Sequence, residues 1–441
     1  MLDRPPRPEF PALNQPPAAE PKASVPAERR RAFAILFLSL LCMGVGQSVI
    51  YTVLSPAGRQ LGIGPLGVTS IFAASATIWI FSSAFWGRRS DYFGRKPIML
   101  VGLIAFGISF LGFASTLWAG LNRWLPPTWV FPLLVASRCI YGGFGSGTSA
   151  AAQAYVADRT SAAERLGGIA VVSMAFALGT TIGPVIGSAL SIFGLLAPLY
   201  FVAVLAIASA ASIFLLLPER TAPKLHAPSA GALRWYEPRM LPFAGFGVIL
   251  SMAASIPIQI AGFFFMDVLH DAPGRAAQHT GIGLMLSAVA ALFAQFVVVQ
   301  RSGLAARTLT RIGLAIAAVS NFLFLVPGQI SVTLSALFIS GFGFGLARPG
   351  FTTGASLSVS PHDQGAVAGI LNAAAAAGFV FGPLIGWLYE FSPFIPFLFG
   401  GAMMLVLLAL QYASPVLRHA GESPPTLKIV EETAETPLSA S

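Results

Sequence analysis

Long apolar runs alternate with short polar segments along most of the chain. Most of these runs exceed the ~20 residues that an α-helix needs to cross the hydrocarbon core of a bilayer. The pattern therefore predicts twelve membrane-spanning helices, whose ends are defined to within a few residues, at 32–55, 66–87, 98–118, 129–156, 167–192, 196–217, 241–266, 279–300, 309–327, 330–358, 365–390 and 393–414.

The polar segments predict the domain organisation. Residues 1–28 and 419–441 carry prolines and charges but no apolar run, so we expect two disordered cytoplasmic tails. The segment 218–240 has the same character and leaves six predicted spans on each side. We therefore expect an N-terminal six-helix bundle at 29–217, a cytoplasmic central loop at 218–240 and a C-terminal six-helix bundle at 241–418.

The composition supports a membrane protein and excludes several other classes. The chain is 55% hydrophobic and only 10% charged, whereas a soluble domain has about 25% charged residues. The net charge of +9 comes from short basic clusters between apolar runs, which indicates loops beside a membrane and not a nucleic-acid-binding face. Cys42 and Cys139 both lie within apolar runs, and we find no metal-ligand spacing, nucleophile–base pair or phosphate-binding loop. We expect no cofactor, no metal, no nucleic-acid partner and no enzymatic activity.

The distribution of basic residues predicts the orientation. Close to the predicted spans, seventeen lysine and arginine residues fall on the side of the N terminus. Three fall on the opposite side, namely Arg59, Arg123 and Arg275. Because cytoplasmic loops carry an excess of basic residues, both termini should be cytoplasmic. Arginine outnumbers lysine by 22 to 4, which is typical of a GC-rich bacterial genome, so we expect a bacterial inner membrane.

An internal repeat indicates that the two sets of six spans are homologous. A glycine–proline pattern in the fifth span recurs in the eleventh at a constant offset of 199 residues. The first copy consists of Gly179, Gly183, Pro184 and Gly187, and the second of Gly378, Gly382, Pro383 and Gly386. The repeat predicts an all-α membrane protein with two pseudo-symmetric six-helix halves.

The loop between the second and third spans has a distinctive pattern. Its G-x-x-x-D-x-x-G-R-K sequence is formed by Gly87, Asp91, Gly94, Arg95 and Lys96. It resembles the corresponding loop of the major facilitator superfamily, and the chain as a whole resembles its twelve-span drug/proton antiporter branch. The resemblance implies that Asp91 latches the two halves together on the cytoplasmic side, where it would meet the N-terminal dipole of the eleventh span. A basic loop that only fixes orientation is the alternative, although it needs neither the glycines nor the acid.

The fourth span carries Arg138 and ends at Asp158. This stretch resembles the helix-4 motif of the same superfamily, whose arginine is linked to proton coupling, so both residues are candidates for that role. An arginine inside a bilayer is costly and needs a cavity or a partner. Alternatively, Arg138 could extend outward to the membrane surface, and Asp158 could be a structural helix cap.

The fifth span resembles the helix-5 antiporter motif of the superfamily, G-x-x-x-G-P-x-x-G-G, with Ser188 in place of the last glycine. Its glycines allow close helix contact and its proline removes one helical hydrogen bond. We therefore expect a bend with a smooth face in the fifth and eleventh spans. Plain small-residue packing is the alternative.

Several polar residues within spans are candidates for a central cavity. Arg348 has no basic counterpart in the first half, where Ser149 holds the matching position. The other candidates are Gln47, Tyr51, Gln259 and Asn372. Hydrogen bonding between helices explains such side chains equally well. Every aspartate and glutamate lies in a tail, a loop or a helix end, so we expect an anionic or neutral substrate.

The resemblance implies a secondary transporter that works by alternating access, and the helix-5 motif favours efflux driven by proton influx. The absence of an acid at mid-membrane depth leaves a uniporter or importer of a small organic solute as the alternative. A receptor or assembly protein that does not transport is the alternative from a different class. The expected partners are a small molecule, protons and the lipid bilayer, and we expect a monomer.

Overall fold

The computed structural model describes residues 26–160, 162–218, 240–326, 328–359 and 364–418. These residues form helices joined by short turns. Most of both expected tails and of the expected central loop lie outside the described residues. The first helix begins at Pro26, so the end of the expected N-terminal tail is helical.

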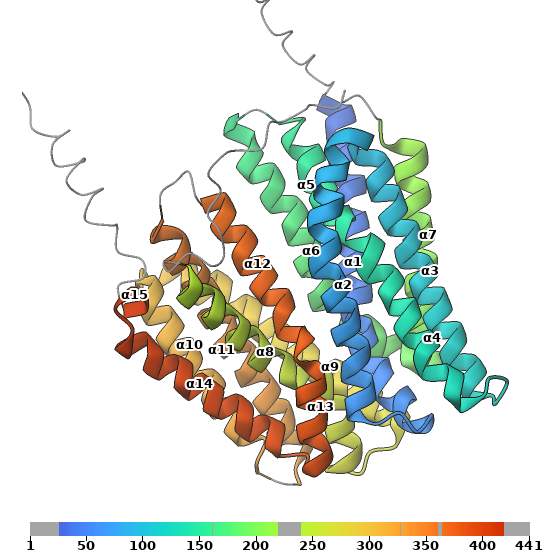
Figure 1. The fold of residues 1–441 in the computed structure, drawn as a ribbon, viewed down its shortest axis with the longest axis vertical. Helices are drawn as coiled ribbons and strands as arrows, with labels where there is room; N and C mark the ends of the chain where they lie inside the picture. The colour runs from blue at the N-terminus through green and yellow to red at the C-terminus, as the bar shows by residue number, and fades with distance from the viewer. Residues whose placement is uncertain (1–25, 161, 219–239, 327, 360–363, 419–441) are drawn as a thin grey trace, which may run out of the picture.

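The first half of the chain forms a group of helices that we call the N-terminal group. Its members pack side by side in the blue-to-green part of Figure 1. They are α1 (Pro26–Gln60), α2 (Pro65–Phe93), α3 (Arg95–Leu121), α4 (Pro127–Ile140), the π-helical turn η1 (Tyr141–Gly145), α5 (Ser146–Ala157), α6 (Ala162–Leu190), the 3-10 turn η2 (Ser191–Phe193) and α7 (Ala197–Leu216).

The second half forms the C-terminal group, coloured from yellow to red in Figure 1. Its members are α8 (Leu241–Asp267), α9 (Pro273–Phe293), the π-helical turn η3 (Ala294–Val299), α10 (Ala306–Leu323), α11 (Ile330–Leu357), α12 (Gln364–Val380), α13 (Gly382–Phe391), α14 (Ile395–Ala413) and the short α15 (Pro415–Arg418).

Ten helices of the described part are long and apolar enough to cross a membrane. Two of the twelve expected spans are not among them. The expected span 129–156 is divided into α4, η1 and α5, because the backbone widens to a π-helical turn at Tyr141–Gly145. The expected span 309–327 corresponds to α10, whose 18 residues include Arg307 and Arg311 in the first two turns.

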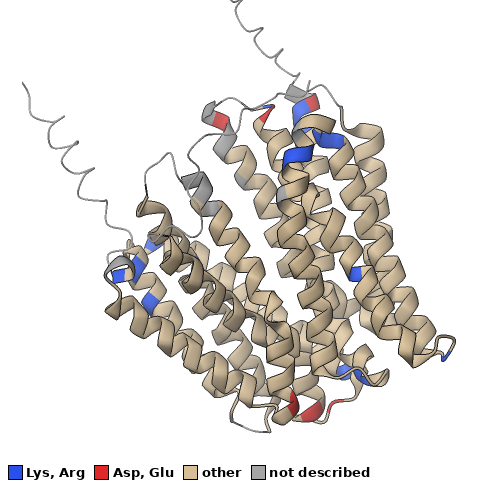
Figure 2. Ribbon diagram, in the orientation of Figure 1, with Lys and Arg blue, Asp and Glu red and all other residues tan. Residues whose placement is uncertain are grey.

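The two ends of the molecule differ. We call the end where α1 begins and α14 ends the termini face, and the opposite end the far face. Figure 2 shows most lysine and arginine residues near the termini face of both groups, where some acidic residues of the N-terminal group also lie, and both acidic and basic residues at the far face. In Figure 1, the two groups meet near the far face and diverge toward the termini face.

Close contact between α1 and α6 depends on glycine. A side-chain carbon added at Gly179 would lie 2.8 Å from the backbone nitrogen of Val45 and 2.9 Å from Cα of Gly44. The backbones of the two helices therefore touch, as small residues allow in membrane proteins. Gly183 continues this contact, since its added carbon would lie 2.6 Å from the carbonyl oxygen of Val45.

We expect Gly179→Leu to prevent α1 and α6 from packing, because the new side chain would overlap backbone atoms that cannot move independently. Overpacking usually costs about 1–3 kcal/mol, and more when backbone must shift. Gly167→Leu on the same helix is the matched control, because Gly167 is exposed and no described atom lies within 4 Å of an added carbon. The amount of monodisperse protein and its thermal unfolding in detergent should fall for Gly179→Leu only. Equal behaviour of the two variants would contradict the contact.

Candidate functional site

The loop motif forms the end of α2, a one-residue turn and the start of α3. Gly94 is the turn, and its φ of 92° lies in the region that favours glycine. At Gly87, no described atom lies within 4 Å of a carbon added to the glycine. The side chain of Asp91 lies outside the described residues, so its latch role remains a prediction.

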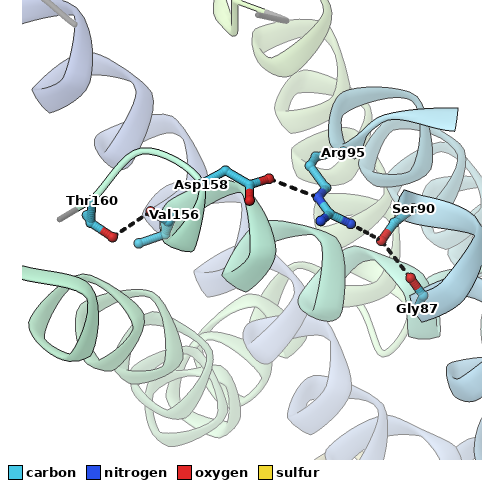
Figure 3. Close-up of polar contacts among 6 residues, drawn as sticks. All are labelled: Gly87, Ser90, Arg95, Val156, Asp158 and Thr160. Atoms are coloured by element: carbon cyan, nitrogen blue, oxygen red, sulfur yellow. Dashed lines mark hydrogen bonds and ion pairs between the residues drawn. The ribbon is translucent and has the colours of Figure 1, made fainter. Parts of the chain in front are cut away.

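Arg95 connects three helices of the N-terminal group (Figure 3). Its Nε lies 3.2 Å from Oδ2 of Asp158 at the end of α5, and its Nη1 donates a hydrogen bond of 2.7 Å to the hydroxyl of Ser90 in α2. The hydroxyl of Ser90 in turn donates to the carbonyl oxygen of Gly87. The sequence motifs did not reveal that Arg95 and Asp158 pair. In this structure the Asp158 carboxylate is an ion-pair partner at a helix C-terminus, which favours the structural alternative.

Lys96 forms hydrogen bonds with the C-terminal end of α7. Its ammonium group donates hydrogen bonds of 2.9 Å and 2.7 Å to the carbonyl oxygens of Phe214 and Leu217 at the end of α7. A cation at a helix C-terminus interacts favourably with the helix dipole. The described hydrogen bonds of Lys96, like the ion pair of Arg95 with Asp158, therefore join helices within the N-terminal group.

Arg138 is buried in the core of the N-terminal group. Only 2% of its surface is exposed, so the alternative in which it extends outward is wrong. Its guanidinium lies 4.8 Å from the ring centroid of Tyr141, one turn further along the chain. Among the described residues, its Nε and Nη1 have no hydrogen-bond partner. The hydroxyl of Ser75 donates to the carbonyl oxygen of Arg138 and so ties α2 to this point.

Tyr51 lies where the two groups meet. Its ring stacks at 6.3 Å on Phe379 of α12 and lies 4.9 Å from Phe72 of α2. Its hydroxyl accepts a 3.2 Å hydrogen bond from Nε2 of Gln47, whose Oε1 lacks a described partner. Two of the predicted cavity residues, Gln47 and Tyr51, are thus brought together. The sequence analysis missed Phe379 and Tyr141, although each is close in sequence to a residue that it had identified.

Gln259 has a different environment from the other cavity candidates. It is 1% exposed, and its Nε2 donates to the hydroxyl of Ser255 one turn earlier in α8. A carbon added at Gly382 would lie 2.7 Å from its Oε1. The side chain is therefore enclosed between α8 and α13. Its described hydrogen bond stays within α8, and its Oε1 has no hydrogen-bond partner among the described residues, so hydrogen bonding between helices is not observed for it.

Arg348 is exposed, although it lies on the inner side of α11. Gly345, three residues earlier, packs on Ala291 of α9, and Phe351, three residues later, stacks on Phe246 of α8. Residues three apart share a helix face, so Arg348 faces the same interior region as these neighbours. Arg348 is therefore exposed on the face of α11 that packs on α8 and α9.

On the face of α12 and α13 that is directed at the N-terminal group, residues are buried near the far face and exposed nearer the termini face. Near the far face, Gly386 and Gly382 are buried against α2, with added carbons 2.6 Å from Cα of Leu66 and 2.8 Å from the carbonyl oxygen of Thr69. Two turns from Phe379, on the same helix face, Asn372 is exposed. The exposure increases toward the termini face, so the two groups separate in that direction.

On α6, exposure also increases from the far face toward the termini face. Near the far face, a carbon added at Gly281 of α9 would lie 2.7 Å from the carbonyl oxygen of Pro184, and the hydroxyl of Ser188 donates to the carbonyl of Gln278. Ala177, two turns from Pro184 on the same face, is exposed. Contacts at one end and exposure at the other define an opening between the groups toward the termini face.

The two copies of the glycine–proline motif have different structures. α6 runs without interruption through Pro184, and its Gly187 packs on the hydroxyl of Thr52 in α1. In the second copy, the helix is interrupted at Phe381, just before Gly382 and Pro383. The helix is thus interrupted in the second copy and continuous in the first, and the expected bend in both spans stays a prediction.

Both copies contact their own group and the other group. In the second copy, Gly378 packs on α8, where an added carbon would lie 2.6 Å from the backbone nitrogen of Met252, and Gly382 lies against both α8 and α2. In the first copy, Gly183 packs on α1, and the carbonyl oxygen of Pro184 lies against Gly281 of α9. The repeated sequence therefore contributes to packing within each group and to the boundary between the groups.

Ten long apolar helices in two groups that diverge toward one face define a multi-pass membrane protein. Residues 36–383 match the model of the Major Facilitator Superfamily, and the chain belongs to that family. The resemblance noted in the sequence is therefore confirmed. A small-molecule substrate and a membrane location follow from the family, whose members are transporters and not enzymes.

Similar proteins include two bacterial resistance proteins and a human transporter of known structure. Multidrug resistance protein 2 of Bacillus subtilis (strain 168) is 28% identical over 396 residues, which cover 87% of this chain and 95% of that protein. Tetracycline resistance protein, class B, of Escherichia coli is 23% identical over 337 residues, covering 71% and 77%. The crystal structure of the human organic anion transporter MFSD10 has a TM-score of 0.60 at 20% identity, covers 88% of this chain and 100% of that one, and shows the shared fold.

The pairing of Arg95 with Asp158 can be measured by a double-mutant cycle. We expect Arg95→Gln and Asp158→Asn each to lower thermal stability in detergent, and the double variant to lose less than the sum. The interaction energy should be about 1–2 kcal/mol, between exposed and fully buried pairs, because both side chains are mostly enclosed. Arg88→Gln, at an exposed arginine of the same motif, is the control and should change little. Strictly additive losses would show that the pair makes no contribution.

Proposed function

We propose that this protein is a secondary active transporter that expels a small organic solute from a bacterial cell by alternating access in exchange for protons. In this proposal, twelve segments cross the inner membrane, including the divided segment α4–η1–α5 and the short α10. They form two pseudo-symmetric six-helix halves at 29–217 and 241–418, with both termini in the cytoplasm. We expect the protein to act as a monomer.

The observation that supports alternating access best is the gradient of exposure between the groups. Glycine-lined contacts close the far face at Gly281, Gly382 and Gly386, whereas Asn372 and Ala177 are exposed nearer the termini face. This arrangement is that of a carrier open toward one side of the membrane. A second state, closed at the termini face and open at the far face, would complete the cycle.

The direction of transport is inferred from the relatives and the motifs. The similar multidrug and tetracycline resistance proteins and the helix-5 pattern both favour efflux. For proton coupling, the candidates are Arg138, which is buried beside Tyr141, and Asp158 at the end of α5. Asp91 is the proposed cytoplasmic latch that closes the termini face in the outward-open state.

Uniport or import remains the second candidate function, because one observation favours it. The sequence has no acid at mid-membrane depth, and Asp158, the nearest candidate, is engaged by Arg95. A proton carrier inside a bilayer is usually an acid or a histidine. The response of transport to a pH gradient separates the two candidates.

Two arginines within the spans favour an anionic or neutral substrate. Arg348 is exposed on the face of α11 that packs on α8 and α9, and Arg138 is buried in the N-terminal group with two guanidinium nitrogens that lack a described hydrogen-bond partner. An arginine at the centre of a bilayer costs roughly 2.5–3.5 kcal/mol on insertion scales. An anionic group would offset this cost, whereas a cation would add to it. The name of the structurally similar organic anion transporter points to the same substrate class.

The proposal is tested by transport in proteoliposomes with an imposed pH gradient and matched pairs of anionic and cationic compounds. We expect the gradient to drive accumulation of anionic or neutral compounds, and Arg348→Gln to reduce anion transport roughly tenfold, since one charge contact is worth about 1.4 kcal/mol. Arg301→Gln, at an exposed arginine of the termini face, is the matched control and should behave like the parent protein. Strong transport of permanent cations that Arg348→Gln leaves unchanged would contradict the substrate assignment. Transport that ignores the gradient would favour the uniporter.

A further inference from the structure

An ion pair joins the two groups at the far face. Arg59, in the last turn of α1, pairs through Nη2 with Oδ2 of Asp267, the last residue of α8. The same guanidinium lies 5.0 Å from the ring centroid of Phe263 in α8. Arg59 thus extends from the N-terminal group onto the surface of the C-terminal group.

A third residue holds the acid in place from its own side. The hydroxyl of Tyr389 in α13 donates a 3.1 Å hydrogen bond to the same Oδ2 of Asp267. Tyr389 is 4% exposed, and its ring lies 6.1 Å from that of Phe263. The C-terminal group therefore provides a binding site for the Arg59 guanidinium, made of Asp267, Tyr389 and Phe263. Arg59 is the residue that can move away from this site.

The glycine contacts beside this ion pair close the same boundary. A carbon added at Gly262, one turn before Asp267, would lie 2.7 Å from Cβ of Ser55 and 3.4 Å from Cδ of Pro56. At Gly262 the contact is made by small side chains, which let the two helices approach closely. The ion pair adds a charged contact to a boundary that also contains the hydrogen bond from Ser188 to the carbonyl oxygen of Gln278.

The exposure of the pair suits a reversible contact. The side chains of Arg59 and Asp267 are 40% and 28% exposed, compared with 11% and 19% for Arg95 and Asp158. Because water already reaches both charges, separating them leaves neither ion buried. Pairs of this kind are weak enough to be broken repeatedly by the free energy of substrate binding.

We propose that Arg59, Asp267 and Tyr389 form a gate that keeps the far face closed, and that Arg59 must leave Asp267 before the solute is released on that side. This inference rests on the proposed alternating access. Opening consists of moving the Arg59 guanidinium away from the carboxylate and from the Phe263 ring, after which water solvates both charges. Tyr389 keeps the carboxylate positioned so that Arg59 can return.

Thiol labelling from the far face measures the closed state directly. The reporter is Thr69→Cys in a protein whose native cysteines are replaced (Cys42→Ser, Cys139→Ser), because Thr69 is 0% exposed and lies beneath Gly382 and Gly386. We expect Asp267→Asn to increase the labelling rate with a membrane-impermeant maleimide about fivefold, the change given by loss of one partly exposed ion pair. Glu390→Gln, at the exposed neighbouring carboxylate, is the matched control and should label like the parent.

Exchanging the charges of Arg59 and Asp267 separates loss of the ion pair from misfolding of the variants. Arg59→Asp alone should label as fast as Asp267→Asn or faster, because two acids would then face each other across the boundary. The exchanged pair Arg59→Asp with Asp267→Arg should restore slow labelling. Unchanged labelling in both single variants, or failure of the exchange in a protein of parental thermal stability, overturns the gate. If the gate variants change labelling as expected but transport by the parent is absent, the proposed transport function fails and the gate stands as a closure.

Discussion

Lipid offers no hydrogen-bond partner, so every polar group in the apolar spans must be satisfied by the protein itself or by trapped water. The backbone meets this demand by forming helices throughout the described residues. Hydroxyl side chains meet it locally, since Ser39 and Thr69 donate to the carbonyl oxygens of Ile35 and Pro65 one turn earlier. The residues that do not fit this rule are the informative ones. Arg138 keeps two nitrogens without a described partner in a buried core, and Arg348 is exposed on an inner surface.

The same demand explains how the two groups can both meet and separate. Their shared boundary contains small residues and backbone atoms at Gly262, Gly281 and Gly386, and few polar side chains that would be stranded when the groups part. The charged contact at this boundary, between Arg59 and Asp267, is placed at the far face, where water is available. Charges within one group, such as Arg95 and Asp158, are more enclosed and connect helices that move together. The ion pair between the groups is therefore the more exposed to water, and the ion pair within a group is the more enclosed.

The sequence predicted the helices well, because long apolar runs have few other stable structures in a membrane. It also identified the motif residues Arg95 and Lys96, the glycines of α6 and the family. It did not show which residues pair across long distances in the chain. Arg95 and Asp158 are 63 positions apart, and Arg59 and Asp267 are 208 apart. It also treated the two copies of the glycine–proline motif as equivalent, whereas the helix is interrupted only at Phe381. Such differences arise from tertiary contacts, which a local pattern does not contain.

The central claim is that the two groups close one face of the molecule while they open the other. It is tested most directly by distances between paired spin labels in the membrane-embedded protein, measured with and without a transported solute and at two pH values. One pair, at the exposed positions Leu216 and Ser302, reports on the termini face, and another, at Thr128 and Gln329, reports on the far face. The account predicts a second population in which the distance at the termini face is shorter and that at the far face longer. Distances that stay constant, or that change in the same direction at both faces, would contradict it.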